Sequence, residues 1–176
     1  ALIYKHRVQK IDSLQNSYEA LSKGTIAAHF IAASKPYIPN TVETANTYIS
    51  NVKANYFKAI DFQDTILQSS NFIVDKSLDY ILRMHLSGTP SFQEYQANID
   101  AVFKALETTD VSYQLITLNT LREALITTEH DTLAVYLTKI YVLPLAKQAN
   151  DTELITSLET FIQIAIGEKA PDFIIE

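Results

Sequence analysis

Glycines and prolines divide this chain into amphipathic segments, and this punctuation constrains the fold more than any other feature. Between the breaks, apolar residues recur at spacings of three and four, as they do along one face of an α-helix. Gly24 follows the first segment as the expected left-handed C-terminal cap, and Pro36 and Pro39 end the second. The pattern predicts a series of helices joined by short loops.

Each predicted helix is defined by apolar residues that share its inner face. In chain order these sets are Tyr4, Val8, Ile11, Leu14, Tyr18 and Leu21; Ile26, Phe30 and Ala33; Val42, Ala45, Ile49, Val52 and Tyr56; Val74, Leu78, Ile81 and His85; Phe92, Tyr95, Ile99, Val102 and Leu106; Val111, Leu115, Leu118 and Leu125; Leu133, Leu137, Ile140 and Tyr141; and Leu154, Leu158, Phe161 and Ala165. The third helix is expected to span residues 41–60.

Cap residues and prolines indicate where these helices begin and end. We expect helices to open at Asp110, Asp131 and either Asn150 or Asp151, and a short helical turn to follow Asp64. Other expected boundaries are Gly88, Thr89-Pro90, a kink at Pro144 and Gly167.

Seven or eight antiparallel helices of this kind predict an all-α fold, either an irregular bundle or a short solenoid, with an extended C-terminal tail. The residue pattern of tetratricopeptide repeats is absent from the sequence. We assign residues 1–167 to a helical domain and residues 168–176 to the tail.

Composition excludes several classes of function. The 176 residues suit one domain or at most two small ones, and a net charge of -6 with scattered basic residues gives no basic surface for nucleic acid. Only three glycines are present, which disfavours Gly-rich phosphate loops, and no cysteine is present for a disulfide, a thiolate zinc site or a nucleophile. The apolar runs are too short for a transmembrane segment.

Catalytic, cofactor and metal sites are not predicted in this chain. It lacks the Glu-x-x-His pairs of di-metal bundles, the His-Glu-x-x-His motif, the Gly-x-Ser-x-Gly motif and an EF-hand loop. We interpret His29 and His85 as core histidines bonded to carbonyl groups, and Glu129 to Asp131 as a loop followed by a helix cap. A metal or carboxylate enzyme site in the bundle is the least favoured function.

Two surface features remain as candidates. Asp75 and Asp79 share a helix face, where Arg83 predicts an ordinary ion pair with Asp79. Tyr37 and Ile38 lie in a loop between two prolines, where they either cover the end of the core or contact a partner.

The C-terminal segment changes character after Gly167. It continues with Glu168, Lys169, Ala170, Pro171, Asp172 and Phe173. This segment resembles the first residues of a thioredoxin-fold redoxin domain. The sequence of residues 8–14, 32–39 and 56–67 resembles the helical region that precedes the redoxin domain in TlpA-like thiol-disulfide oxidoreductases of Bacteroidetes-type bacteria.

The resemblance implies a domain arrangement and a function. A Cys-x-x-Cys pair would lie beyond Glu176 in an attached redoxin domain, so no catalytic residue can be assigned in this chain. The chain would be a non-catalytic accessory domain in the periplasm or cell envelope, lipid-anchored in many relatives. Its role would be to position the oxidoreductase, to dimerise it or to bind its protein substrate. The alternative is a stand-alone helical domain that binds a peptide or a small apolar ligand.

Phe173, Ile174 and Ile175 form an uninterrupted apolar run typical of a buried strand. Without the rest of a sheet, they are expected to be mobile or to contact an apolar patch on the same or another molecule. Deletion of residues 169–176 should therefore change the free energy of unfolding by less than about 1 kcal/mol.

Overall fold

The regular elements of the protein are helical throughout the part described by the computed structural model, residues 2–86 and 88–165. They are α1 (Leu2–Ser22), α2 (Ile26–Ala33), α3 (Ala45–Ala54), α4 (Thr65–Gln68), α5 (Phe72–Arg83), α6 (Phe92–Leu106), α7 (Val111–Thr127), α8 (Asp131–Leu137), the π-helix η1 (Thr138–Val142), α9 (Leu143–Ala149) and α10 (Thr152–Ile164). The predicted all-α class is confirmed. Gly167 and the predicted tail lie outside the described residues.

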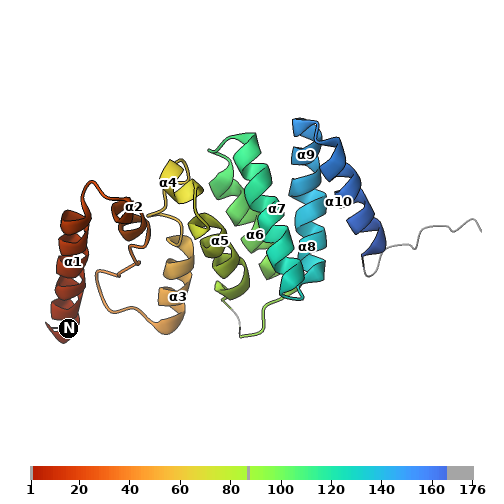
Figure 1. Ribbon diagram of the computed structural model, residues 1–176. Coiled ribbons are helices and arrows are strands. Elements are labelled where there is room, and N and C mark those ends of the chain that lie inside the picture. The colour runs from red at the N-terminus through yellow and green to blue at the C-terminus, as the bar shows by residue number, and fades with distance from the viewer. Residues whose placement is uncertain (1, 87, 166–176) are drawn as a thin grey trace, which may run out of the picture.

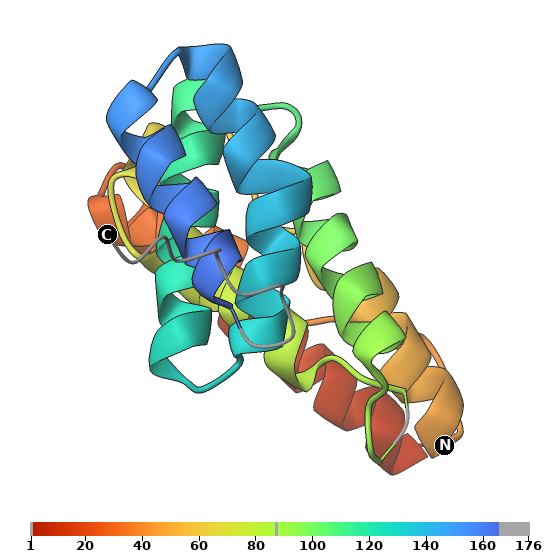
Figure 2. The ribbon, with the colours of Figure 1, turned by 90° about the vertical axis from the view of Figure 1, so that its right-hand side faces the viewer.

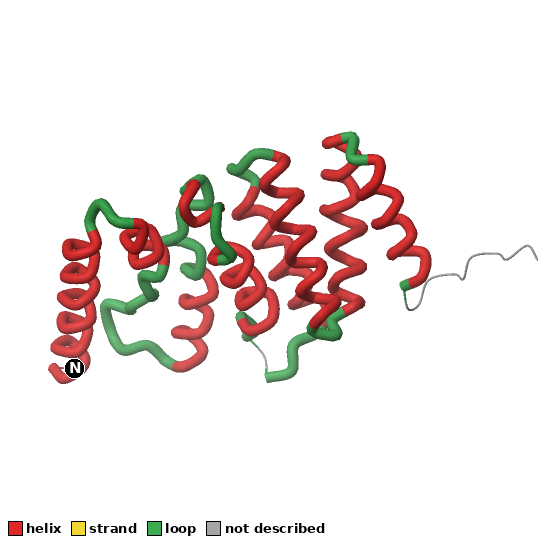
Figure 3. The backbone as a smooth tube through the Cα atoms, viewed as in Figure 1, coloured by secondary structure: helices red, strands yellow, loops and turns green. Residues whose placement is uncertain are grey.

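The helices follow one another along the long axis of the molecule in chain order (Figure 1), with α1 at one end and α10 at the other. Viewed along this axis, α10 lies beside the continuous run of α8, η1 and α9 (Figure 2). Short connections join most neighbours, but a long irregular segment leads from α2 to α3 (Figure 3). This segment passes between α1 and α3.

Several predicted helix boundaries are confirmed by the backbone. Gly24 has a φ of 79°, which suits a residue without a Cβ. The carboxylates of Asp64, Asp110 and Asp151 each accept a backbone N–H at the start of a helix. Asn150 ends α9 in the left-handed conformation.

Other predicted boundaries are wrong, and α5 ends at Arg83, before His85 and Gly88. Helix α6 opens at Ser91 rather than at Thr89-Pro90, because Ser91 and Glu94 form a reciprocal capping box. Helix α8 is preceded by His130, so Asp131 is its first residue and not its cap. Glu129 precedes His130 with a φ of 62°, and the side chain of His130 makes no cap hydrogen bond to α8.

The expected kink at Pro144 takes the form of a π-helical turn. Pro144 has no N–H to donate within the helix. The π-helix η1 ends two residues before it, and the N–H of Leu143 is bonded to the carbonyl of Thr138. The wider turn moves the inner face on by one residue. Val142 is fully buried while Ile140 is half exposed, so the prediction that Ile140 faces the core is wrong.

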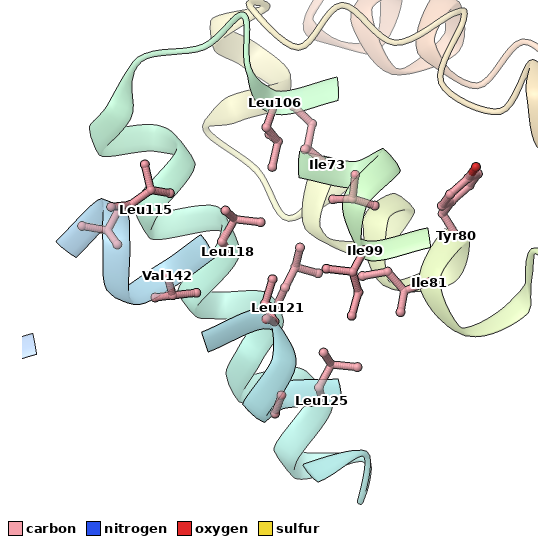
Figure 4. Close-up of a cluster of buried hydrophobic side chains, with 14 of the residues drawn as sticks. Ile73, Tyr80, Ile81, Ile99, Leu106, Leu115, Leu118, Leu121, Leu125 and Val142 are labelled. Carbon is pink, nitrogen blue, oxygen red and sulfur yellow. The ribbon is translucent and has the colours of Figure 1, made fainter. Parts of the chain in front are cut away.

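The core lies in the second half of the array. Its fully buried side chains come from α4 to α10, and Figure 4 shows those of α5, α6 and α7 pointing toward one another. The largest are Leu67, Ile73, Ile81, Ile99, Leu106, Leu118, Leu121, Leu125, Leu137 and Leu158. This part of the chain supplies most of the apolar burial that stabilises the fold.

The first three helices are covered much less. Helix α3 has no buried residue and spans ten residues rather than the predicted twenty. In α1, Ile11, Leu14, Tyr18 and Leu21 are exposed, contrary to the prediction that they face the core. The helical period of α1 is correct, but α1 ends the array, and only its side toward α2 and the following segment is covered.

Candidate functional site

A cavity of about 370 Å³ lies between α1 and α3. We call it the α1–α3 groove. Its walls come from one face of α1, from the irregular segment after α2, and from the first turn of α3. The residues are Tyr4, Arg7, Val8, Ile11, Tyr37, Ile38, Pro39, Val42, Glu43 and Tyr48.

Hydrogen bonds within and between the segments that line the groove hold it in place. The hydroxyl of Tyr4 on α1 donates to the carbonyl of Pro39 at 2.7 Å. The hydroxyl of Tyr37 donates to Oε1 of Glu43 at 2.9 Å, and the side-chain amide of Asn51 on α3 donates to the same oxygen at 2.7 Å. Glu43 therefore ties the irregular segment to α3.

The second carboxylate oxygen of Glu43 is buried and has no hydrogen-bond partner. Such a group is costly to bury, since it gives up water without a replacement. Burial raises the pKa of the phenols of Tyr4 and Tyr37, and the negative charge of Glu43 raises both further. The groove thus combines an apolar wall with the carboxylate of Glu43, whose negative charge acts on the neighbouring tyrosines.

The rim of the groove exposes apolar and aromatic side chains from all three segments. Ile11 on α1, Val42 in the irregular segment and Tyr48 on α3 are 44%, 69% and 43% exposed. The Tyr37 and Tyr48 rings are 6.2 Å apart between centroids. Contiguous exposure of this kind is typical of binding surfaces.

A second cavity, of about 230 Å³, contains His29 and Asp64. Nδ1 of His29 lies 2.5 Å from Oδ2 of Asp64, and alanines 28, 32, 33 and 59 form much of the wall. The prediction that His29 bonds a carbonyl is wrong, because its partner is the carboxylate that caps α4. The pair offers no nucleophile or oxyanion donor on its own.

The other predicted polar contacts are mostly confirmed. Nε2 of His85 lies 2.9 Å from the carbonyl of Leu82, as expected for a partly buried histidine. Arg83 forms the expected ion pair with Asp79 at 3.1 Å, and Tyr56 also donates to Asp79. Within the described residues, no group of three or more His, Cys, Asp or Glu side chains could hold a metal ion.

A cluster around Asp100 was not predicted from the sequence. The hydroxyls of Tyr136 and Tyr141 donate to Oδ1 of Asp100 at 2.8 and 2.7 Å, which links α6 to α8 and η1. Residues five apart diverge by about 140° on an α-helix, whereas the π turn brings them to one side. No pattern of three and four spacings reveals such a pair.

Of the predicted partner-binding residues, Tyr37 and Ile38 lie together in the α1–α3 groove. Phe173, Ile174 and Ile175 lie outside the described residues. Tyr4 and Glu43 were not predicted as site residues, since neither belongs to a recognisable motif. The proline-flanked loop was the one signal that pointed to this region.

Comparison with protein-family models, curated proteins and solved structures gives no match to this chain. Among the described helices, none is long and apolar enough to span a membrane.

Proposed function

We propose that this chain is a non-catalytic helical accessory domain of an envelope thiol-disulfide oxidoreductase, and that it presents the α1–α3 groove to a protein partner. The observation that carries the binding role is the groove itself, where apolar side chains from three segments surround a cavity of about 370 Å³. Protein-binding surfaces characteristically expose aromatic and aliphatic side chains in this way. Support for the attached oxidoreductase comes from the redoxin-like sequence that follows Gly167.

Without a cysteine, the chain by itself cannot carry out thiol-disulfide exchange. We expect no reduction of insulin by the purified chain above the dithiothreitol blank. The gene downstream of Glu176 should encode a Cys-x-x-Cys pair. Its absence would contradict the accessory-domain proposal and favour a stand-alone domain.

The binding role is tested in the full-length parent protein. Val42→Gln makes the groove rim polar without adding a charge, at a side chain exposed enough to tolerate it. Reduction of a protein disulfide should fall about fivefold or more, while reduction of a small aromatic disulfide stays unchanged. Ile116→Gln on α7 is the matched control, since Ile116 is similarly exposed and does not line the groove. Equal activity of the two variants on the protein disulfide would contradict the proposal.

A stand-alone peptide- or small-ligand-binding domain is the second candidate. The volume of the groove favours it, because it falls in the range of about 300–1,000 Å³ that holds small ligands.

A further inference from the structure

The electrostatics of the α1–α3 groove indicate the charge of its ligand. Glu43 has one oxygen that accepts two hydrogen bonds and a second that is buried without a partner. No ion pair to Glu43 is found in the described part of the chain. A cation brought into the groove would compensate this carboxylate.

The aromatic lining suits the same kind of ligand. Tyr37 and Tyr48 are tilted by 40° with centroids 6.2 Å apart, and Tyr4 completes the tyrosine wall. Aromatic faces attract ammonium and guanidinium groups electrostatically and also pack against aliphatic chains. The net charge of -6 would further favour a positively charged partner.

We propose that the α1–α3 groove binds a basic side chain of a partner polypeptide, with the charged head near Glu43 and the aliphatic stem along Tyr37 and Tyr48. This inference rests on the proposed protein-binding function and adds the chemistry that the partner must present. A charge within about 4–6 Å of the carboxylate is enough for attraction, so direct contact with the buried oxygen is not required.

Arg7 also lines the groove, and this makes the sign of the ligand testable. For a cationic ligand, Arg7 opposes binding and Glu43 favours it. For an anionic ligand the two residues exchange roles. Substitutions at these two positions therefore have opposite effects under the two alternatives.

The experiment titrates the purified chain with short blocked peptides and follows its backbone amide NMR signals. One peptide carries a central lysine between leucines, and its counterpart carries norleucine in place of lysine. We expect the lysine peptide to shift signals from α1 and residues 37–43, and to bind about tenfold more tightly than the norleucine peptide. n-Butylammonium, which has the same head without the flanking chain, should bind more weakly than the lysine peptide.

Two variants and a control complete the test. Glu43→Gln retains an acceptor for Tyr37 and Asn51, and should weaken lysine-peptide binding about tenfold. Arg7→Ala should leave the affinity unchanged or raise it. Glu107→Gln removes the same charge from an exposed residue outside the groove and should have no effect. If Glu43→Gln fails to fold, Arg7→Ala and the norleucine comparison still test the charge.

Several results would overturn the inference. They are absence of shifts with the lysine peptide, equal affinity for the lysine and norleucine peptides, unchanged affinity in Glu43→Gln, or loss of binding in Arg7→Ala. Equal affinity for n-butylammonium and the lysine peptide would overturn a polypeptide as the occupant. Failure here leaves the result for Val42→Gln intact, so the inference and the proposed function can fail separately.

Discussion

His29 on α2 lies 2.5 Å from Asp64, the residue that caps the N-terminus of α4. One oxygen of Asp64 accepts the backbone N–H groups of Ile66 and Leu67, and the other faces the imidazole. The contact joins the weakly covered start of the array to its core. A single carboxylate thus fixes both a helix end and the neighbouring helix.

Substitution of Asp64 should destabilise the fold. Asp64→Ala removes the cap and the contact with His29, and should lower the free energy of unfolding by about 1–2 kcal/mol. Asp64→Asn should cost less, since asparagine also caps helices. Urea denaturation at neutral pH measures both, with the exposed Asp12→Asn as a control.

The same residue predicts a pH dependence. Burial alone would raise the pKa of the Asp64 carboxyl, but hydrogen bonds from His29, Ile66 and Leu67 outweigh it and hold this pKa below its ordinary value. Ionised Asp64 therefore stabilises the fold above about pH 4, and this contribution is lost as the pH falls through the lower pKa of the folded state. The stability difference between the native chain and Asp64→Asn should shrink at acid pH. A constant difference down to about pH 2 would contradict this.

Asn98 should be the most sensitive buried polar residue of the core. Its side-chain amide donates to the carbonyls of Tyr80, Ile81 and Met84, which closes the C-terminal end of α5. Asn98→Ala removes these three buried hydrogen bonds, although the carbonyl of Tyr80 keeps the backbone N–H of Met84, and should cost about 2–3 kcal/mol. Asn16→Ala on the exposed face of α1 should change stability by about 0.5 kcal/mol or less.

Asp100 should control the titration of Tyr136. Burial together with the hydrogen bond and charge of Asp100 raises the pKa of Tyr136 to about 12. Asp100→Asn should lower this pKa toward the ordinary value of about 10 without reaching it, because burial remains. Because folding raises this pKa, the protonated phenol of Tyr136 stabilises the fold fully below about pH 10. This contribution is lost as the pH rises through the pKa of the folded state. The titration of Tyr136 is measured by tyrosinate absorbance, as the difference between the native chain and the Tyr136→Phe variant.

Hydrogen exchange of the backbone amides should be fast in the first helices and slow in the core. Helix α3 has no buried residue, whereas α7 contains several fully buried leucines. We expect amides of α1 and α3 to exchange about 100-fold faster than those of α7, because local opening needs less free energy there. Uniform protection measured by exchange and mass spectrometry would show that the groove belongs to the same cooperative unit as the core.

The sequence correctly predicted burial for those helices whose apolar face packs against another helix. Asp110 caps α7 and Leu106 lies on the buried face of α6, as predicted, because local capping and periodicity determine these features. Burial of α1 was predicted wrongly, since Tyr18 and Leu21 have the right spacing but no neighbouring helix covers them. Periodicity describes one helix and cannot show where an array ends.

The candidate site was only partly predictable for the same reason. The loop with Tyr37 and Ile38 stood out because two prolines excluded it from any helix. Glu43 gains its role from Asn51 and from the packing of α1, which are tertiary relations.

The π turn at Thr138–Val142 allows one continuous helix to serve two sets of neighbours. Before the turn, α8 contacts α6 and α7; after it, α9 contacts α7 and α10. The extra residue in the turn shifts the buried face along the sequence, and Leu145 and Ala146 are buried after the turn as Leu133 and Ala134 are before it. One local irregularity therefore lies between the part of the helix that packs against α6 and the part that packs against α10, and a change in winding there would alter which side chains meet the final helix.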